Sequence, residues 1–115
     1  MVTIFDERER AFETRFAREE ELRFRARSRR NRLLAAWAGE RMELTGETAS
    51  GYVASFTESS VAATDASVLA RLLADLRAHG IEAPLPALCK EMERCAALAR
   101  AEQRVGLALD QGSSV

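Results

Sequence analysis

A chain of 115 residues provides one domain with one modest core, which excludes a two-domain enzyme with a large substrate cleft. Hydrophobic residues make up 47% and charged residues 30%, a balance typical of globular proteins and unlike that of disordered or membrane proteins. The net charge of −1 provides no general attraction to nucleic acid, and the two Pro and six Gly are too few for a sandwich or barrel, so we expect an all-α fold.

Residues 6–44 predict one very long helix, because they contain no Pro and a single Gly and are rich in Glu, Arg, Ala and Leu. We expect this helix to end near Gly46, in a left-handed conformation. At ~1.5 Å per residue it would measure about 58 Å, whereas a compact domain of this length has a radius of gyration of about 13 Å. Its N-terminal third must therefore project into water, unfold or bind a partner.

The long helix carries two apolar stripes that do not join. On a straight wheel at ~100° per residue, one stripe faces a bundle and consists of Leu22, Ala26, Leu33, Trp37 and Leu44. Phe5, Phe12 and Phe16 form the other stripe, centred roughly 70° away. Acidic residues dominate up to Glu21, and residues 22–32 contain six arginines and no acid. We expect these arginines to flank the bundle-facing stripe, with their stems over apolar neighbours and their guanidinium groups in water.

Two shorter helices are predicted next. The first begins at Glu47 or Thr48 and carries an apolar face at a spacing of three or four, namely Ala49, Tyr52, Val53 and Phe56. A linker of small residues, 57–64, follows it. Asp65 then offers its carboxylate as an N-cap for a helix that ends at His79, with Gly80 in the left-handed position. The wide apolar stripe of this helix consists of Val68, Leu69, Leu72, Leu73 and Leu76.

The last predicted helix starts between Pro84 and Pro86 and runs toward Arg104. Its heptad-like seam consists of Leu85, Leu88, Met92, Cys95 and Ala99. Helices with one apolar face each must cover it against one another, so we expect a four-helix bundle. The expected organisation is an N-terminal arm (1–18), the bundle (19–109) and a frayed tail (110–115).

The sequence offers no set of residues for catalysis, a metal or a cofactor. His79 is the only histidine and is expected to cap a helix C-terminus, where a partly charged ring is favourable. Cys89 and Cys95 lie roughly 120° apart on a helix, too divergent for a disulfide or shared metal coordination. Lys90 is the only lysine, and no phosphate-binding glycine loop precedes it. We therefore expect a protein that is not an enzyme and that holds no cofactor or metal.

The arginine block is not expected to bind nucleic acid, because its cations are split onto two sides of a core-facing seam and acids lie just upstream. Ion pairs at a spacing of four residues, Glu19 with Arg23 and Glu21 with Arg25, explain much of this concentration of arginines. The N-terminus has no signal sequence, and the apolar stretches are too short to span a membrane. These features predict a cytoplasmic protein without membrane insertion.

Phe5, Phe12 and Phe16 allow two interpretations. They could fold back onto the bundle as ordinary core. Alternatively, they could anchor a mobile arm in pockets of another protein, with Arg8, Arg10 and Arg15 forming ion pairs around them. In the second case the arm would lose conformational entropy on binding, and the size of this loss would set the affinity of the contact.

The N-terminal half contains the stretches Phe5-Asp6-Glu7-Arg8-Glu9-Arg10-Ala11-Phe12-Glu13, Phe16-Ala17, Glu20-Glu21-Leu22-Arg23-Phe24, Arg29-Arg30-Asn31-Arg32-Leu33-Leu34 and Trp37-Ala38. Together they closely resemble the start of the alphaproteobacterial zeta subunit of the F-type ATP synthase, a small inhibitor of ATP hydrolysis. The resemblance spans residues 5–44 and continues more loosely through the two later helices. It implies a four-helix bundle with a mobile inhibitory N-terminal segment.

The resemblance also implies a mechanism and a partner. The arm would enter a catalytic interface of the ATPase head, between alpha and beta subunits, with Phe5, Phe12 and Phe16 packed and Arg8, Arg10 and Arg15 paired to carboxylates. The bundle would hold the arm in place and touch the central stalk with its arginines. We expect a monomer when free, peripheral to the inner membrane through the ATP synthase. The alternative is a helical regulatory or assembly module that binds another protein through the Phe face.

Overall fold

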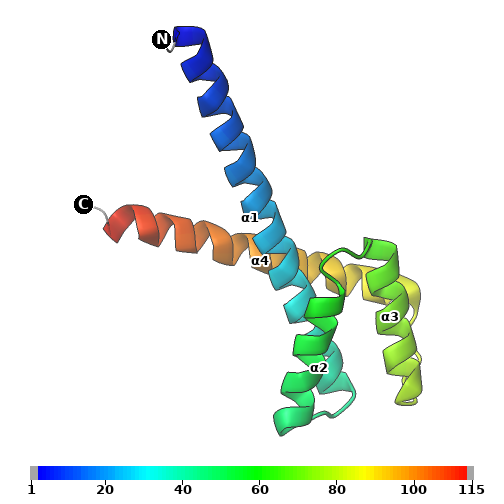
Figure 1. Ribbon diagram of the computed structural model, residues 1–115. Coiled ribbons are helices and arrows are strands. Elements are labelled where there is room, and N and C mark those ends of the chain that lie inside the picture. The colour runs from blue at the N-terminus through cyan, green and yellow to red at the C-terminus, as the bar shows by residue number, and fades with distance from the viewer. Residues whose placement is uncertain (1–2, 114–115) are drawn as a thin grey trace.

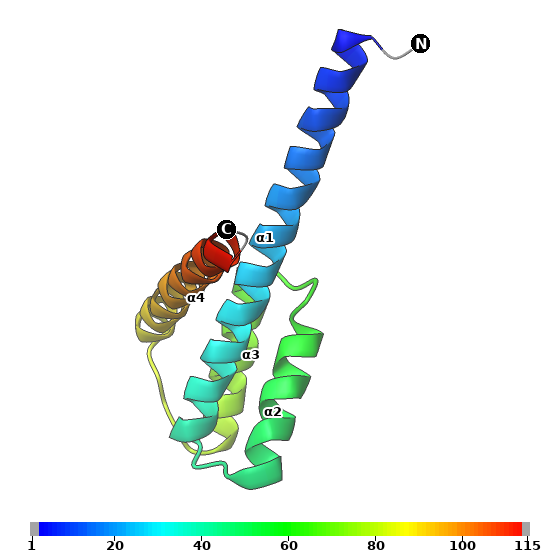
Figure 2. The same cartoon turned by 90° about the vertical axis from the view of Figure 1, so that its left-hand side faces the viewer.

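The computed structural model describes residues 3–113 of the chain, and within them it contains four helices and no strand. The helices are α1 (Ile4–Arg41), α2 (Gly46–Ser59), α3 (Asp65–Ala78) and α4 (Leu85–Ser113). α2 and α3 lie alongside the C-terminal half of α1, and α4 crosses α1 near its middle (Figures 1 and 2). The predicted all-α bundle with a long first helix is confirmed.

The N-terminal part of α1 projects from the bundle as a continuous helix (Figure 2). The radius of gyration is 18.5 Å, and the extents are 65 × 31 × 25 Å. A compact domain of this length would have a radius of about 13 Å. Of the three outcomes expected for the N-terminal third, the structure therefore has the helix projecting into water. Residues 1 and 2 of the expected arm lie outside the described residues.

α1 ends earlier than the sequence predicts. Its C-cap is Met42, and the turn is made by Glu43 in the left-handed region, at φ 59°. The Leu44 amide donates to the Gly39 carbonyl at 2.9 Å, which folds the Leu44 side chain back toward the core. Gly46 is left-handed as predicted, at φ 57°, but it is the first residue of α2. The left-handed residue that follows α1 is therefore Glu43 and not Gly46, and the turn at Glu43 lets Leu44 pack against the core.

The core joins all four helices, and its α1 face differs from the predicted one. Buried side chains come from α1 and its C-cap (Leu34, Ala35, Ala38 and the cap residue Met42), α2 (Phe56), α3 (Val68, Leu72, Leu76) and α4 (Leu88, Met92, Cys95). The predicted seam residues Leu33, Trp37 and Leu44 only pack at the edge of this core. On a straight wheel the buried face lies roughly 140° from the predicted seam. It also contains Arg30 and Asn31, two polar residues that an apolar pattern does not count as core.

α3 confirms its predicted apolar stripe and its C-terminal cap, but not its N-cap. His79 is the C-cap residue and its Nδ1 lies 3.0 Å from the Asp75 carbonyl oxygen, while Gly80 is left-handed at φ 76°. At the other end, Thr64 is the N-cap, and its hydroxyl oxygen accepts the Ser67 amide at 3.2 Å. Asp65 is instead the first helical residue, and its carboxylate pairs with Arg27 and Arg30 on α1.

A polar contact on the outer side joins α2 to α3. The Tyr52 hydroxyl donates to Asp75 Oδ2 at 2.8 Å, and Arg71 Nε donates to the same oxygen at 3.3 Å. Burial, together with the Asp75 carboxylate, raises the pKa of Tyr52. The guanidinium of Arg71 also lies over the Phe56 ring, 4.9 Å from its centroid. These contacts hold the short α2 against the rest of the bundle.

α4 is longer than expected and leads away from the bundle at its C-terminal end (Figure 1). Leu88, Met92, Cys95 and Ala99 of the predicted seam are buried, but Leu85 is 49% exposed because it precedes the first contact with the core. The helix passes Arg104 and continues through Ser113, into the segment for which we expect fraying. That fraying stays a prediction, and residues 114 and 115 lie outside the described residues. None of the helices over residues 4–113 is long and apolar enough to cross a bilayer.

Candidate functional site: an exposed helical arm and its base

The exposed segment at the start of the described chain runs from residue 3 to residue 21, three residues beyond the expected arm (1–18), and every residue in it is exposed; below, the arm means residues 3–21. Phe5 is 77% exposed, Phe12 69% and Phe16 55%. The interpretation that these rings fold back as ordinary core is therefore wrong. Three large rings on one face of a helix form an apolar surface that nothing in the described part of the chain covers.

The arm is helical because both its start and its composition favour a helix. The Asp6 amide donates to the Thr3 hydroxyl at 3.2 Å, and the Thr3 amide donates to the Asp6 carboxylate at 3.4 Å, which is a complete capping box. Asp6 and Glu7 place negative charge at the positive end of the helix dipole. Every residue from 3 to 21 is exposed, and the side-chain hydrogen bonds and ion pairs described for them join neighbours along α1, so these local terms and the continuity of α1 maintain the helix.

The three predicted arm arginines do not lie equally close to the rings. On a straight wheel, Arg8 and Arg15 lie roughly 60–80° from the centre of the Phe stripe. Arg10 lies roughly 140° from it, on the opposite side of the helix. All three are exposed, and no ion pair within the described part of the chain involves them. A partner that contacts one side of the helix would therefore meet the rings together with Arg8 and Arg15. Arg10 would be reached only by a partner that surrounds the helix.

Ion pairs connect the arm to the basic segment that follows it. Arg25 pairs with Glu21 at 2.5 Å, as predicted. Arg23 pairs with Glu20, three residues before it, and not with Glu19. Arg18 also reaches Glu21, at 3.4 Å. Such pairs favour helix across the boundary between acidic and basic residues, which is where the arm leaves the bundle.

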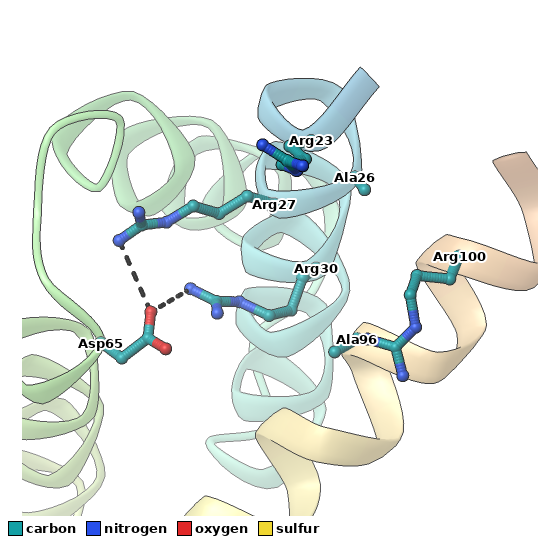
Figure 3. A pocket seen from close by; sticks show the side chains of 7 residues that line it. All are labelled: Arg23, Ala26, Arg27, Arg30, Asp65, Ala96 and Arg100. Carbon is teal, nitrogen blue, oxygen red and sulfur yellow. Dashed lines mark ion pairs between the residues drawn. The ribbon is translucent and has the colours of Figure 1, made fainter. Parts of the chain in front are cut away.

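Several arginines of the basic segment contact the bundle itself, contrary to the prediction that their guanidinium groups all reach water. Asp65 Oδ1 lies 2.9 Å from Arg30 Nη2 and 3.5 Å from Arg27 Nη2 (Figure 3). Arg27 also donates to the Ala63 carbonyl, and Arg30 donates to Asn31 Oδ1 at 2.9 Å. These contacts form because the N-terminus of α3 packs against α1 there. An open pocket of about 330 Å³ lies beside them and is lined by Arg23, Ala26, Arg27, Arg30, Asp65, Ala96 and Arg100.

A second set of contacts ties the base of the arm to α4. Arg29 Nε donates to Glu102 Oε2 at 2.8 Å, and Arg29 Nη2 donates to Glu102 Oε1 at 3.3 Å. This hydrogen bond lowers the pKa of the Glu102 carboxyl. Next to it, the Gln103 side-chain amide donates to the Leu22 carbonyl at 2.7 Å. Leu22 is also the first half-buried residue of α1.

Sequence reasoning missed one exposed apolar pair at the base of the arm. Phe24 is 53% exposed and Val61 51% exposed, and both line a small hollow with Asn31 and Thr57. Phe24 lies in the arginine block, and Val61 lies in a loop of small residues, so neither belongs to an apolar period. Only the packing of α1 against the α2–α3 loop brings them together.

The arrangement supports binding more than chemistry. Within residues 3–113 there is no group of three or more His, Cys, Asp or Glu side chains that could hold a metal ion. Cys95 is buried, and burial together with the Glu91 carboxylate raises its thiol pKa to about 11, which makes it a poor nucleophile. The surface that distinguishes the molecule is the arm, a long exposed helix with an apolar stripe.

Comparison with known proteins identifies one family. Residues 1–102 match the model of the family described as ATPase inhibitor subunit zeta. The matched range contains the arm, α1, α2 and α3 and reaches Glu102 on α4. No curated protein sequence and no solved structure matches the chain.

Proposed function

The chain belongs to the family of ATPase inhibitor zeta subunits, and on that premise we propose that it blocks ATP hydrolysis by inserting its arm into the head of the F-type ATP synthase. The arm enters a catalytic interface between an alpha and a beta subunit. The alphaproteobacterial source that the resemblance implies stays a prediction.

The observation that carries this proposal is the exposure of Phe5, Phe12 and Phe16 on a helix that the rest of the chain does not cover. Burying one such side chain contributes roughly 1.5–3 kcal/mol. Exposed aromatic rings at helical spacing are the usual anchors of a helix that binds in a groove. Because the three rings are not buried in the core of the monomer, the free energy of burying them can contribute to binding a partner.

The shape of the arm suits a cleft. Residues 4–21 extend about 27 Å at ~1.5 Å per residue as a single helix, which is narrower than the four-helix bundle behind it. A catalytic interface that must close around its nucleotide cannot close while a helix occupies it, so hydrolysis stops. Enclosure by the interface also brings partner carboxylates to Arg10 as well as to Arg8 and Arg15, on both sides of the helix.

The bundle holds the arm in place and makes a second contact with the ATP synthase, at the central stalk. Arg27, Arg29 and Arg30 pair with residues of α3 or α4, so a contact with the central stalk falls to the exposed arginines that are not tied to another helix, Arg23, Arg25 and Arg32. The protein acts as a monomer, in the cytoplasm, and is peripheral to the inner membrane through the ATP synthase. It needs no cofactor for this role.

The test is an inhibition titration on the purified cognate ATPase head, with the intact chain and with a variant lacking residues 1–18. We expect the intact chain to inhibit and the shortened chain to lose inhibition while its circular dichroism still shows a folded bundle. Phe24→Ala is the matched control, because it removes an exposed ring outside the arm. Full inhibition by the shortened chain would show that the arm is not the inhibitory element.

A further inference from the structure

Two neighbouring residues of α4, Glu102 and Gln103, contact α1 close to the point where the arm begins. The Gln103 side-chain amide donates to the Leu22 carbonyl at 2.7 Å. Glu102 accepts two hydrogen bonds from Arg29, at 2.8 and 3.3 Å. Leu22 and Arg29 are two turns apart on α1, so the two contacts hold the same stretch of helix at both of its ends. We name this set of four residues the brace.

The brace lies where the arm leaves the bundle. On its N-terminal side every described residue of α1 is exposed, from Glu21 back to Thr3. On its C-terminal side, α1 becomes buried from Arg30 onward. The Leu22 carbonyl already belongs to the ladder of α1, so the bond from Gln103 adds an anchor that helix formation alone does not require.

Anchoring this turn matters because an exposed helix of this length is marginal by itself. Forming the first turn is unfavourable, whereas adding residues to a fixed turn is close to neutral or favourable. A turn held against α4 therefore serves as the start from which the helix extends into the arm. It also fixes the direction in which the arm leaves the bundle. Release of the turn would let fraying advance toward the core and would let the arm swing.

We propose that Glu102 and Gln103 are positioning residues of the arm: by holding Arg29 and Leu22 they fix the point and the direction from which the Phe stripe projects. This inference rests on the proposed inhibitory function, and it assigns a role to α4 that the arm alone does not imply. Gln103 lies just beyond the residues that match the family model.

The test combines amide hydrogen exchange with inhibition of the ATPase head, using the full-length chain. Gln103→Ala removes the bond to Leu22, and Glu102→Gln weakens the pair with Arg29. Arg104→Ala and Glu93→Gln are matched controls, since both change exposed side chains of α4 outside the brace. A charge swap, Arg29→Glu with Glu102→Arg, rebuilds the pair in the opposite direction.

We expect the two brace variants to exchange amides in residues 12–24 several-fold faster than the wild type, while amides in residues 34–42 keep their rates. Each variant should raise the inhibitor concentration for half-maximal inhibition, by about fivefold for Gln103→Ala and about two- to fivefold for Glu102→Gln. The controls should behave as the wild type, and the charge swap should restore most of the inhibition lost in Glu102→Gln.

Three results would overturn the inference. Unchanged exchange in residues 12–24 would show that the brace does not hold the arm. Faster exchange that extends equally through residues 34–42 would show a general loss of stability. Faster arm exchange with wild-type inhibition would show that positioning does not matter for function. The variant lacking residues 1–18 separates this test from that of the proposed function: if it loses inhibition while the brace variants inhibit as the wild type does, only the brace is wrong.

Discussion

Arg30 Nη2 on α1 lies 2.9 Å from Asp65 Oδ1 at the first residue of α3. The Arg30 side chain is 10% exposed, whereas that of Asp65 is 59% exposed. A nearly buried guanidinium thus reaches outward to a carboxylate at the surface, and the same carboxylate also faces Arg27. The pair links the segment next to the arm to the second half of the chain.

Asp65→Asn should lower the free energy of unfolding by about 1–2 kcal/mol, because Arg30 keeps its charge and loses its anionic partner. The measurement is denaturant unfolding. Glu47→Gln is the matched control, since it neutralises a first-turn carboxylate of α2 for which no ion pair is described. Glu47→Gln should lower the free energy of unfolding by less than about 1 kcal/mol, the usual effect of a charge on the helix dipole. Equal losses in both variants would mean that the pair with Arg30 adds nothing.

Phe12→Ala and Phe56→Ala should have opposite consequences. Phe12 is 69% exposed and Phe56 is fully buried. Phe56→Ala should therefore destabilise the bundle by about 3–5 kcal/mol, whereas Phe12→Ala should leave the melting temperature unchanged. If Phe12 anchors the arm, its removal should weaken inhibition by about 2 kcal/mol, or roughly 30-fold. Thermal unfolding and an inhibition titration measure the two effects, and a wild-type inhibition constant for Phe12→Ala would count against the anchor.

Glu43→Gly should stabilise the protein by about 0.5–1 kcal/mol, because Glu43 occupies the left-handed region at φ 59°, where a side chain is unfavourable. Glu40→Gly, within the last turns of α1 and also exposed, is the matched control. It should destabilise by about 1 kcal/mol, the usual cost of Gly inside a helix. Thermal melting in parallel decides the question: a loss of stability in Glu43→Gly would contradict the turn geometry.

Cys95 should react slowly with thiol reagents at pH 8 while Cys89 reacts faster. Cys95 is buried, and its raised pKa of about 11 leaves little thiolate at that pH, whereas Cys89 is half-buried. The thiolate fraction of Cys95 should rise only as the pH approaches 11, so the difference should persist through pH 9. Mass spectrometry after timed labelling resolves the two sites. Equal labelling of both in the native protein would contradict the packing of α4.

Much of the fold could be predicted from the sequence because capping residues, glycines and prolines mark where several of its helices begin and end. The left-handed Gly80, the cap at His79 and the position of Pro86 in the first turn of α4 depend on a few neighbouring residues only. The length of α1 already indicated that the bundle could not cover its N-terminal third, although the sequence left open whether Phe5, Phe12 and Phe16 fold back, and the structure shows them exposed.

Features that depend on packing between distant segments could not be predicted. The buried face of α1 includes Arg30 and Asn31, whose side chains bond to each other, and Arg30 also pairs with Asp65, a residue 35 positions away that no local pattern on α1 reveals. Thr64 and not Asp65 is the N-cap of α3, and the Asp65 carboxylate pairs with Arg30 across the bundle, a contact that the neighbouring residues do not indicate. The exposed pair of Phe24 and Val61 arises from a loop that no periodicity describes.

Whether the arm is uncovered in the free protein and bound by the ATPase head can be measured by amide hydrogen exchange in the free chain and in the complex. In the free chain, amides in residues 5–18 should exchange far faster than those around Leu34, because nothing covers this part of α1. In the complex they should become strongly protected, while the bundle core keeps its rates. Arm amides that exchange equally fast in both states would contradict the account.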